Sequence, residues 1–210
     1  MRKAKIQIKV CGIRDPHNLE ELCTLDPEFV GFIFYRGSKR HVGEHPDPAL
    51  FRIPGPAVKK VGVFVDEKLD RVRMAIEIYG LDVVQLHGTE SVDYCRKIGM
   101  EELEVIKVLD PQAGGTELDR YRQHVDYFLF DSAGAGSGGS GEKFNWKLLE
   151  DLPAHLPFFL SGGIGPGDAG PVRSLDLGGL VGVDVNSRFE LYPGIKDIKA
   201  LKEFFSEIRK

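Results

Sequence analysis

Short apolar runs recur along the whole chain at nearly regular intervals. Most of them are continuous, as in strands that are buried on both faces, rather than alternating. Eight strands are expected, at residues 6–11, 29–34, 61–65, 82–86, 104–108, 127–131, 158–161 and 180–185. Their starts, from residue 6 to residue 180, are spaced by about 25 residues, which leaves room for one helix after each strand.

Most of the intervals between these runs carry a helical pattern. Asp15 and Pro16 suit the cap and the first position of a helix after the first run. Asp66 is expected to cap a helix that Gly80 ends. The expected apolar stripes are Leu19, Leu22 and Cys23; Leu69, Val72, Ile76 and Tyr79; Val92, Cys95 and Ile98; and Ile198, Leu201, Phe204, Phe205 and Ile208.

Two intervals contain helix-breaking residues. Residues 41–60 include four prolines, so the second helix should be short and displaced. Residues 165–171 include two prolines and three glycines, so the seventh helix should start late or be brief.

Repeated strand-helix units have two plausible arrangements: an open doubly wound sheet or a closed (β/α)8 barrel. The first strand is followed by Cys-Gly-Ile-Arg-Asp rather than by the glycine pattern of a dinucleotide fold. Polar or reactive residues stand where nearly every strand ends, and barrel enzymes build their sites at those ends. They are Cys11, Tyr35 with Arg36, Asp66, His87, Asp131, Ser161 and Asp184. The sequence therefore predicts a TIM barrel, as a single catalytic domain over residues 1–210.

Charge and composition narrow the function. The net charge of −4 argues against a nucleic-acid surface but leaves phosphorylated metabolites as ligands, since local dipoles and a few cations hold them. Three cysteines without C-x-x-C spacing indicate neither a disulfide framework nor a structural zinc site. No run approaches the roughly 20 apolar residues of a membrane span, and the first ten residues lack an apolar signal core. We expect a cytoplasmic protein that acts as a monomer or a homodimer.

Cys11 and Asp131 are the candidate base and acid. A cysteine is often only a small buried hydrophobe, and an aspartate after a strand is often a helix cap. Here Gly12 leaves room beside the sulfur, and nearby cations or the dipole of a phosphate site are expected to tune the thiol into a base that works near neutral pH. Asp131 follows four apolar residues, where partial desolvation is expected to raise its pKa and let it donate a proton.

Two glycine- and serine-bearing segments suit a phosphate group. Residues 161–165 follow the seventh strand and residues 184–188 follow the eighth, the place where barrels bind phosphate. The stretch 132–141 contains only Gly, Ser and Ala and is interpreted as a lid rather than a domain linker, because the repeat continues across it.

Three further side chains are candidates for binding a ligand. Arg40 is either a surface cation or a fork for a substrate carboxylate. Gln85 and His87 alternate with apolar neighbours, so both are expected to point towards the barrel interior or its mouth. With no second ligand at a suitable spacing from His87, we expect no metal.

Together these motifs make the chain resemble the phosphoribosylanthranilate isomerase family over essentially its whole length. The resemblance rests on an ordered set: K-V-C-G-I (9–13), V-G-F-I-F-Y (30–35) with S-K-R (38–40), V-G-V-F-V (61–65), V-Q-L-H-G (84–88), F-D (130–131), G-G-S-G-x-x-F-x-W (138–146), S-G-G-I (161–164), D-V-N-S-R-F-E (184–190) and P-G-x-K-D (193–197).

The resemblance implies an Amadori rearrangement of N-(5-phosphoribosyl)anthranilate in tryptophan biosynthesis, without a cofactor. It implies that Cys11 is the general base and Asp131 the general acid. It also implies that Arg40 meets the anthranilate carboxylate and that Gly162, Gly163, Asn186 and Ser187 hold the phosphate. Many members have D-V-S-S-G where this chain has Asp-Val-Asn-Ser-Arg at 184–188, which leaves the geometry of that loop open.

Two rival functions remain on the same barrel. A Schiff-base aldolase would use Lys9 or Lys107, which lie within the first and fifth strands. A phosphosugar-binding protein without turnover would use the phosphate segments alone.

Overall fold

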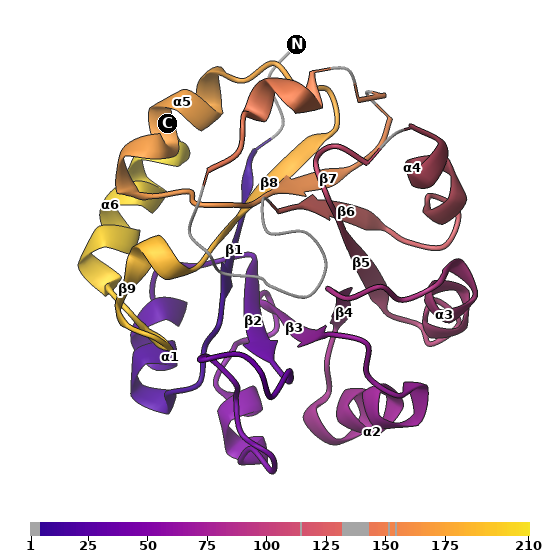
Figure 1. Cartoon of the computed structure of the whole chain (residues 1–210). Coiled ribbons are helices and arrows are strands. Elements are labelled where there is room, and N and C mark those ends of the chain that lie inside the picture. The colour runs from indigo at the N-terminus through magenta and orange to yellow at the C-terminus, as the bar shows by residue number, and fades with distance from the viewer. Residues whose placement is uncertain (1–4, 114, 132–142, 151, 154) are drawn as a thin grey trace.

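Eight parallel strands close into a barrel at the centre of the molecule (Figure 1). The computed structural model describes residues 5–113, 115–131, 143–150, 152–153 and 155–210. The strands are β1 (Gln7–Cys11), β2 (Phe29–Ile33), β3 (Lys59–Phe64), β4 (Val83–Leu86), β5 (Glu104–Leu109), β6 (Tyr127–Phe130), β7 (Phe158–Leu160) and β8 (Leu180–Val185). Pairing of β1 with β8, which sets Lys9 beside Asp184, closes the ring. The predicted barrel and its strands are confirmed, with bounds that differ by no more than two residues.

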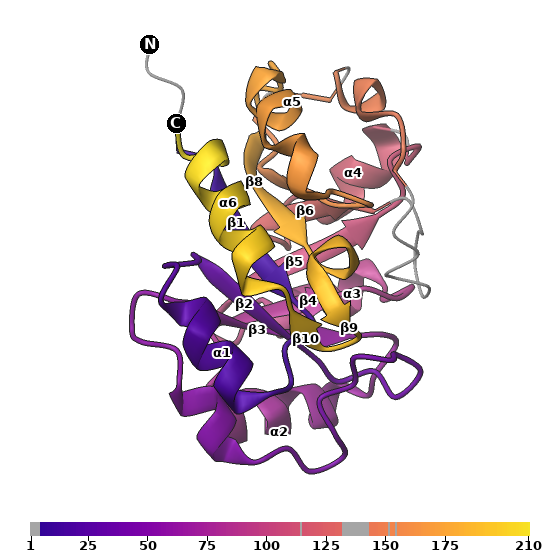
Figure 2. The same ribbon diagram turned by 90° about the vertical axis from the view of Figure 1, so that its left-hand side faces the viewer.

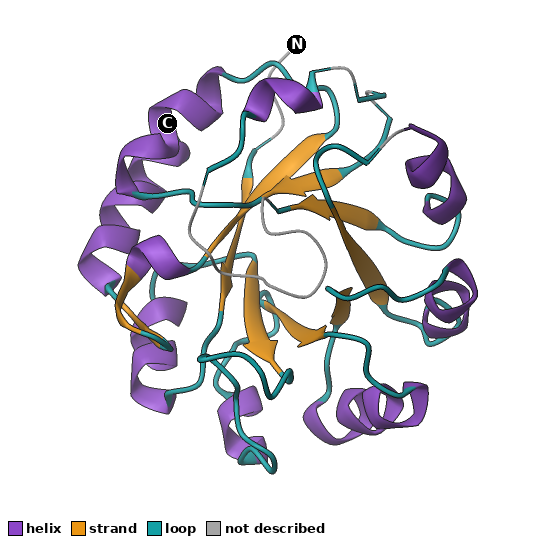
Figure 3. Ribbon diagram, viewed as in Figure 1, coloured by secondary structure: helices purple, strands orange, loops and turns teal. Residues whose placement is uncertain are grey.

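Helices surround the barrel as an outer layer (Figure 3). The α-helices are α1 (Pro16–Cys23), α2 (Leu69–Tyr79), α3 (Val92–Ile98), α4 (Gly115–Tyr121), α5 (Ala169–Ser174) and α6 (Ile198–Ile208). Short 3-10 helices are η1 (Pro48–Arg52), η2 (Trp146–Leu149), η3 (Pro166–Asp168) and η4 (Ser187–Phe189). In the part of the chain that the structure describes, none of these helices combines the length and hydrophobicity needed to cross a membrane.

Helix ends follow the chain's local chemistry in most units. Asp15 accepts a hydrogen bond from the Asn18 amide at the start of α1. Gly80 ends α2 in the left-handed conformation, at φ 58°. The proline-rich interval forms only η1, and the interval after β7 forms η3 and the short α5, as predicted.

The expected cap of α2 is wrong. Lys68, not Asp66, occupies the position before the helix, and it makes no side-chain cap. Asp66 has a φ of 48°, and its Oδ1 instead accepts hydrogen bonds from the backbone amide and hydroxyl of Thr89, at 2.7 and 3.0 Å. The carboxylate therefore ties the loop after β3 to the loop after β4.

Two hydrophobic clusters stabilise the fold. The larger lies between the strands and the helices. The smaller fills the barrel interior, as in other closed barrels. Its buried members are Cys11, Phe29, Val61, Val63, Val83, Ile106, Val108, Leu129 and Phe159. Cys11, the last residue of β1, therefore lies at the edge of a packed interior, where the strands end, rather than in an open pore.

A short antiparallel hairpin extends the barrel unit after β8. It consists of β9 (Glu190–Tyr192) and β10 (Ile195–Lys196). In Figure 1 β9 lies between α6 and α1, and Figure 2 shows both strands below the lower end of α6. The Asn18 side chain of α1 bonds both the backbone amide and the carbonyl of Lys196, at 2.7 and 3.0 Å. These two bonds fix the hairpin to the side of the barrel.

Candidate active site

A cavity of about 550 Å³ opens where the strands end at their carboxyl termini. Every residue that the sequence nominated for the site lines it: Cys11, Arg40, Gln85, His87, Asp131, Gly162, Gly163, Asn186 and Ser187. Tyr35, Ser161 and Asp184 from the set of strand-end residues line it as well. Asp66 and Arg36 do not: Asp66 bonds Thr89, and Arg36 pairs with Glu44 at the surface.

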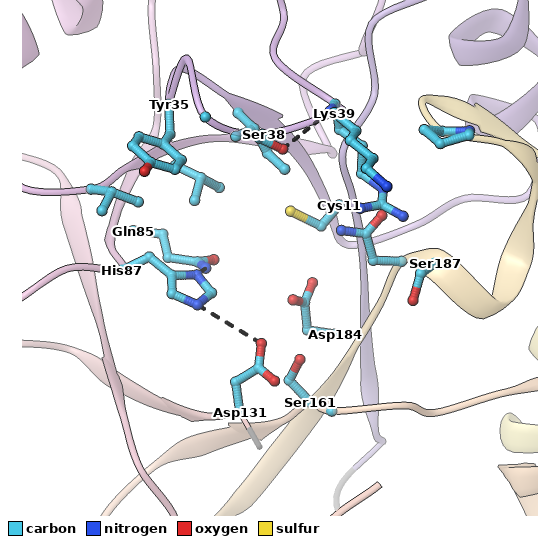
Figure 4. Close-up of a pocket in the computed structure, with 18 of the residues that line it drawn as sticks. Cys11, Tyr35, Ser38, Lys39, Gln85, His87, Asp131, Ser161, Asp184 and Ser187 are labelled. Carbon is cyan, nitrogen blue, oxygen red and sulfur yellow. Dashed lines mark hydrogen bonds and ion pairs between the residues drawn. The ribbon is translucent and has the colours of Figure 1, made fainter. Parts of the chain in front are cut away.

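Cys11 and Asp131 enter this cavity from different parts of the barrel. Cys11 is the last residue of β1, and Asp131 follows β6 directly. Both are nearly buried, with 3% and 7% of their surface exposed. Figure 4 shows the sulfur and the carboxyl group pointing into one space. A thiol and a carboxyl group set in this way can act on two positions of one ligand.

A buried ion pair lies beneath Cys11. Lys9 precedes it by two residues, so both side chains face the barrel interior, and the Lys9 ammonium donates to Asp184 Oδ1 at 2.7 Å. Burial and the Asp184 charge raise the pKa of the Cys11 thiol, while the Lys9 and Lys196 charges lower it. The expected cations are present, but burial and Asp184 outweigh them, so the pKa shifts away from neutrality, opposite to the predicted tuning by cations.

Gln85 and His87 both line the cavity at the end of β4, as their alternation predicted, and they also form a hydrogen-bonded pair. Gln85 Nε2 lies 3.1 Å from His87 Nδ1. Burial lowers the pKa of His87 to about 4, and the charges of Lys9 and Lys107 add to this, so the ring is neutral at pH 7. Because the amide donates to Nδ1, the ring proton is assigned to Nε2, which lies 3.8 Å from Asp131 Oδ2 (Figure 4).

The segments after β7 and β8 meet on the same cavity. Gly162 and Gly163 have φ of 80° and 67°, a region that side chains other than glycine rarely adopt. Asn186 and Ser187 follow β8 and line the cavity beside them. This arrangement fits the predicted phosphate segments, which stay a prediction.

Arg40 lines the cavity and is already engaged by a carboxylate. Its Nε and Nη2 bond Glu190 of β9 at distances of 2.7 to 2.9 Å. No role for Glu190 or Lys196 follows from the sequence, although both lie within the motifs S-R-F-E and P-G-x-K-D. For Lys9 the only role suggested from the sequence is that of a Schiff-base lysine, whereas its i, i+2 spacing to Cys11 is the signal for its place beneath the thiol.

The two lysines that a Schiff-base aldolase would use are both bound to carboxylates. Lys9 is paired with Asp184, and Lys107 bonds Glu90 Oε2 at 2.8 Å. Neither lines the cavity, so neither is placed to attack a carbonyl there. Among the described residues, no three His, Cys, Asp or Glu side chains are grouped so as to hold a metal ion. The proposed lid, residues 132–141, lies outside the described part of the chain.

Comparison with known proteins decides the family. Residues 8–207 match the family model described as N-(5'phosphoribosyl)anthranilate (PRA) isomerase. The chain belongs to this isomerase family. It is 40% identical to the N-(5'-phosphoribosyl)anthranilate isomerase of Parabacteroides distasonis, over 96% of this chain and 92% of that protein.

Solved isomerase structures show the same fold. The phosphoribosyl anthranilate isomerase of Thermus thermophilus superposes with a TM-score of 0.85 at 27% identity, covering 97% of this chain and 98% of that one. A second isomerase was solved in complex with reduced 1-(o-carboxyphenylamino)-1-deoxyribulose 5-phosphate. It superposes with a TM-score of 0.78 at 29% identity, covering 97% of this chain and 98% of that one.

Proposed function

We propose that this chain converts N-(5'-phosphoribosyl)anthranilate into 1-(2-carboxyphenylamino)-1-deoxyribulose 5-phosphate in tryptophan biosynthesis. The reaction is an Amadori rearrangement, an aldose-to-ketose isomerisation by general acid-base catalysis. One observation carries the proposal: the Cys11 thiol and the Asp131 carboxyl group enter a single cavity that an arginine and two glycine- and serine-bearing segments also line.

Asp131 starts the reaction by protonating the furanose ring oxygen. The bond from C1' to that oxygen then breaks, and the sugar opens to an iminium ion. Cys11 removes the proton from C2', which gives an enolamine. The enolamine tautomerises to the ketone by taking a proton at C1' and releasing the proton of its 2'-hydroxyl group. Return of one proton from the Cys11 thiol to the Asp131 carboxylate restores both groups. Substrate and product are isomers, so no electron leaves the ligand, and the steps call for no cofactor.

The neighbours of the two groups suit these steps. The Lys9 and Lys196 charges favour the Cys11 thiolate against the effect of burial. The neutral His87 ring directs its Nε2 proton towards Asp131, where it stabilises the carboxylate left after the acid has given up its proton. Gln85 keeps the ring in that tautomer.

The remaining candidates bind the two ends of the substrate. Arg40 meets the anthranilate carboxylate, and Gly162, Gly163, Asn186 and Ser187 surround the phosphate. Residues 1–210 act as one catalytic domain in the cytoplasm, as a monomer or a homodimer.

The proposal is tested by the loss of fluorescence of freshly prepared N-(5'-phosphoribosyl)anthranilate. Cys11→Ala and Asp131→Asn are each expected to lower kcat about 10²- to 10⁴-fold, or roughly 3–5 kcal/mol of barrier, while ligand affinity is largely kept. Cys23→Ala is the matched control, since Cys23 lies in α1 outside the cavity, and should retain normal turnover. Near-normal turnover in either site variant would refute its assignment, and phosphate binding without turnover in the wild type would favour a non-enzymatic sugar phosphate binder.

A further inference from the structure

Arg40 owes its orientation to a carboxylate on another element. It lies in the segment after β2, and Glu190 lies on β9 of the hairpin. Arg40 Nε is 2.9 Å from both carboxylate oxygens, and Nη2 is 2.7 Å from Oε2. The Glu190 side chain is only 4% exposed. Since Glu190 takes the Nε side of the guanidinium group, a ligand carboxylate is left the Nη1 side.

The same carboxylate is also bound by a second cation. Lys196 Nζ donates to Glu190 Oε1 at 2.8 Å, and the Gly194 amide donates to that oxygen at 3.0 Å. Although burial of Glu190 works the other way, its bonds to Arg40 and Lys196 hold its pKa below the usual value, so it stays ionised.

Lys196 also reaches the segment that follows β8. Its Nζ donates to Asn186 Oδ1 at 2.7 Å, and Asn186 lines the cavity on the side of the predicted phosphate segments. A serine, which many family members carry here, is one atom shorter and has no amide oxygen to accept this bond. The contact between Lys196 and the Asn186 amide therefore depends on a residue in which this chain departs from its family's pattern.

Two of these side chains, Arg40 and Asn186, approach the backbone next to Cys11. Gly12 has a φ of 80°, and a Cβ there would lie 2.7 Å from Arg40 Cδ and 2.8 Å from Asn186 Oδ1. Glycine at this position thus lets Arg40 and Asn186 both approach the residue that follows the thiol.

We propose that Arg40, Glu190, Lys196 and Asn186 form a positioning relay that fixes the carboxylate-binding arginine relative to the phosphate segment. Glu190 and Lys196 are positioning residues, since they act through Arg40 and Asn186. The relay makes the site selective for ligands that carry a carboxylate and a phosphate at one set separation. This inference rests on the proposed function, because that function assigns the carboxylate to Arg40 and the phosphate to the segment of Asn186.

The test uses two stable ligands, reduced 1-(o-carboxyphenylamino)-1-deoxyribulose 5-phosphate and the same compound without its carboxyl group. Their dissociation constants are measured by calorimetry on the wild type, Glu190→Gln, Asn186→Ser and the double variant. Glu203→Gln is the matched control, because Glu203 is exposed on α6 and does not line the cavity. The wild type and this control should prefer the carboxylated ligand to the same extent.

Glu190→Gln should reduce that preference by about tenfold or more, through weaker binding of the carboxylated ligand alone. Asn186→Ser should reduce the preference for the carboxylated ligand by a smaller factor. The double variant should show the same preference as Glu190→Gln, since both changes interrupt one relay. Equal weakening of both ligands, or effects of the two changes that simply multiply, would overturn the relay.

Asn186→Ser keeps the inference testable if Glu190→Gln does not fold, because it leaves the ion pairs of Glu190 intact. An unchanged preference in folded Asn186→Ser then contradicts the relay. Failure of the proposed function is a separate result: it appears as wild-type protein that does not turn over phosphoribosylanthranilate. Wild-type turnover with an unchanged preference in the variants overturns the relay alone.

Discussion

Two buried lysines with similar bonds have different consequences on opposite sides of the barrel. Lys9 of β1 pairs with Asp184 at 2.7 Å, and Lys107 of β5 pairs with Glu90 at 2.8 Å. Both lysines are essentially inaccessible to solvent. Buried ion pairs are weak indicators of stability by themselves, because desolvation offsets much of their attraction. Their other partners decide what each pair does.

Lys107 is surrounded by acceptors that hold a loop. Its ammonium group donates to the carbonyls of Leu86 and Gly88 as well as to Glu90. Glu90 in turn accepts from the amides of Asp66 and Gly88. This network fixes the loop after β4, at whose start His87 stands, and keeps the lysine away from the cavity.

Lys9 is placed to act on a reactive group instead. Its partner Asp184 lines the cavity, and its charge opposes the effect of burial on the pKa of Cys11. A buried lysine bound by two backbone carbonyls and a carboxylate thus anchors a loop, whereas one placed two residues before a thiol on the same strand face lowers the pKa of that thiol.

The largest expected effect is on stability, in Lys107→Met. This change leaves the Glu90 carboxylate buried without its cation, and should lower the free energy of unfolding by about 3–5 kcal/mol in urea titrations. In Lys107→Met/Glu90→Gln most of that loss should be recovered, since glutamine keeps an acceptor for the Gly88 and Asp66 amides without the charge. A loss below about 1 kcal/mol in the single variant would mean that Lys107 is not an anchor.

A second effect concerns His87, which both lysines influence. The pKa of the His87 ring is near 4 in the folded protein and about 6.5 in the unfolded chain. As the pH falls, the unfolded chain therefore takes up this proton before the folded protein does. Stability present above pH 6.5 is therefore lost as the pH falls towards 4, by up to about 3 kcal/mol. His87→Gln should remove this part of the slope in urea titrations between pH 4 and 7, whereas His17→Gln, at an exposed position, should not. An unaltered slope in His87→Gln would contradict the low pKa.

The smallest expected effect separates the two lysines by activity. Lys9→Met removes a cation that lowers the pKa of Cys11, so that pKa rises further and the ascending limb of kcat/KM moves to higher pH. A shift of one unit lowers kcat/KM at pH 7 about tenfold. In folded Lys107→Met the limb should stay in place. The comparison fails if both variants shift the limb equally, or if neither does.

The strands, the barrel and the lining of the cavity were predictable because they depend on local pattern. Parallel strands buried on both faces have a recognisable composition, and their carboxyl ends meet at one rim, so Cys11, His87 and Asp131 come together without further information. Asp66 was misassigned because a carboxylate before a helix can cap that helix or bond a neighbouring loop, and only the fold decides between these.

The relay and the net pKa shift of Cys11 were beyond the sequence for a different reason. Glu190 bonds Arg40 although the two residues are 150 positions apart in the chain, and the sequence pattern does not predict the hairpin that brings them together. Burial raises the pKa of Cys11, and the charges of Lys9 and Lys196 lower it. Residue spacing alone does not show which of these opposing effects is larger.

The most direct test of the account is a crystal structure of this protein with reduced 1-(o-carboxyphenylamino)-1-deoxyribulose 5-phosphate. We predict that Cys11 Sγ and the Asp131 carboxyl group both contact the opened sugar chain, with C2' about 3–4 Å from the sulfur. The phosphate should lie at Gly162, Gly163, Asn186 and Ser187, and the carboxylate at Arg40. A ligand bound elsewhere, or bound in the cavity with either Cys11 or Asp131 out of its reach, would contradict the assignment of base and acid.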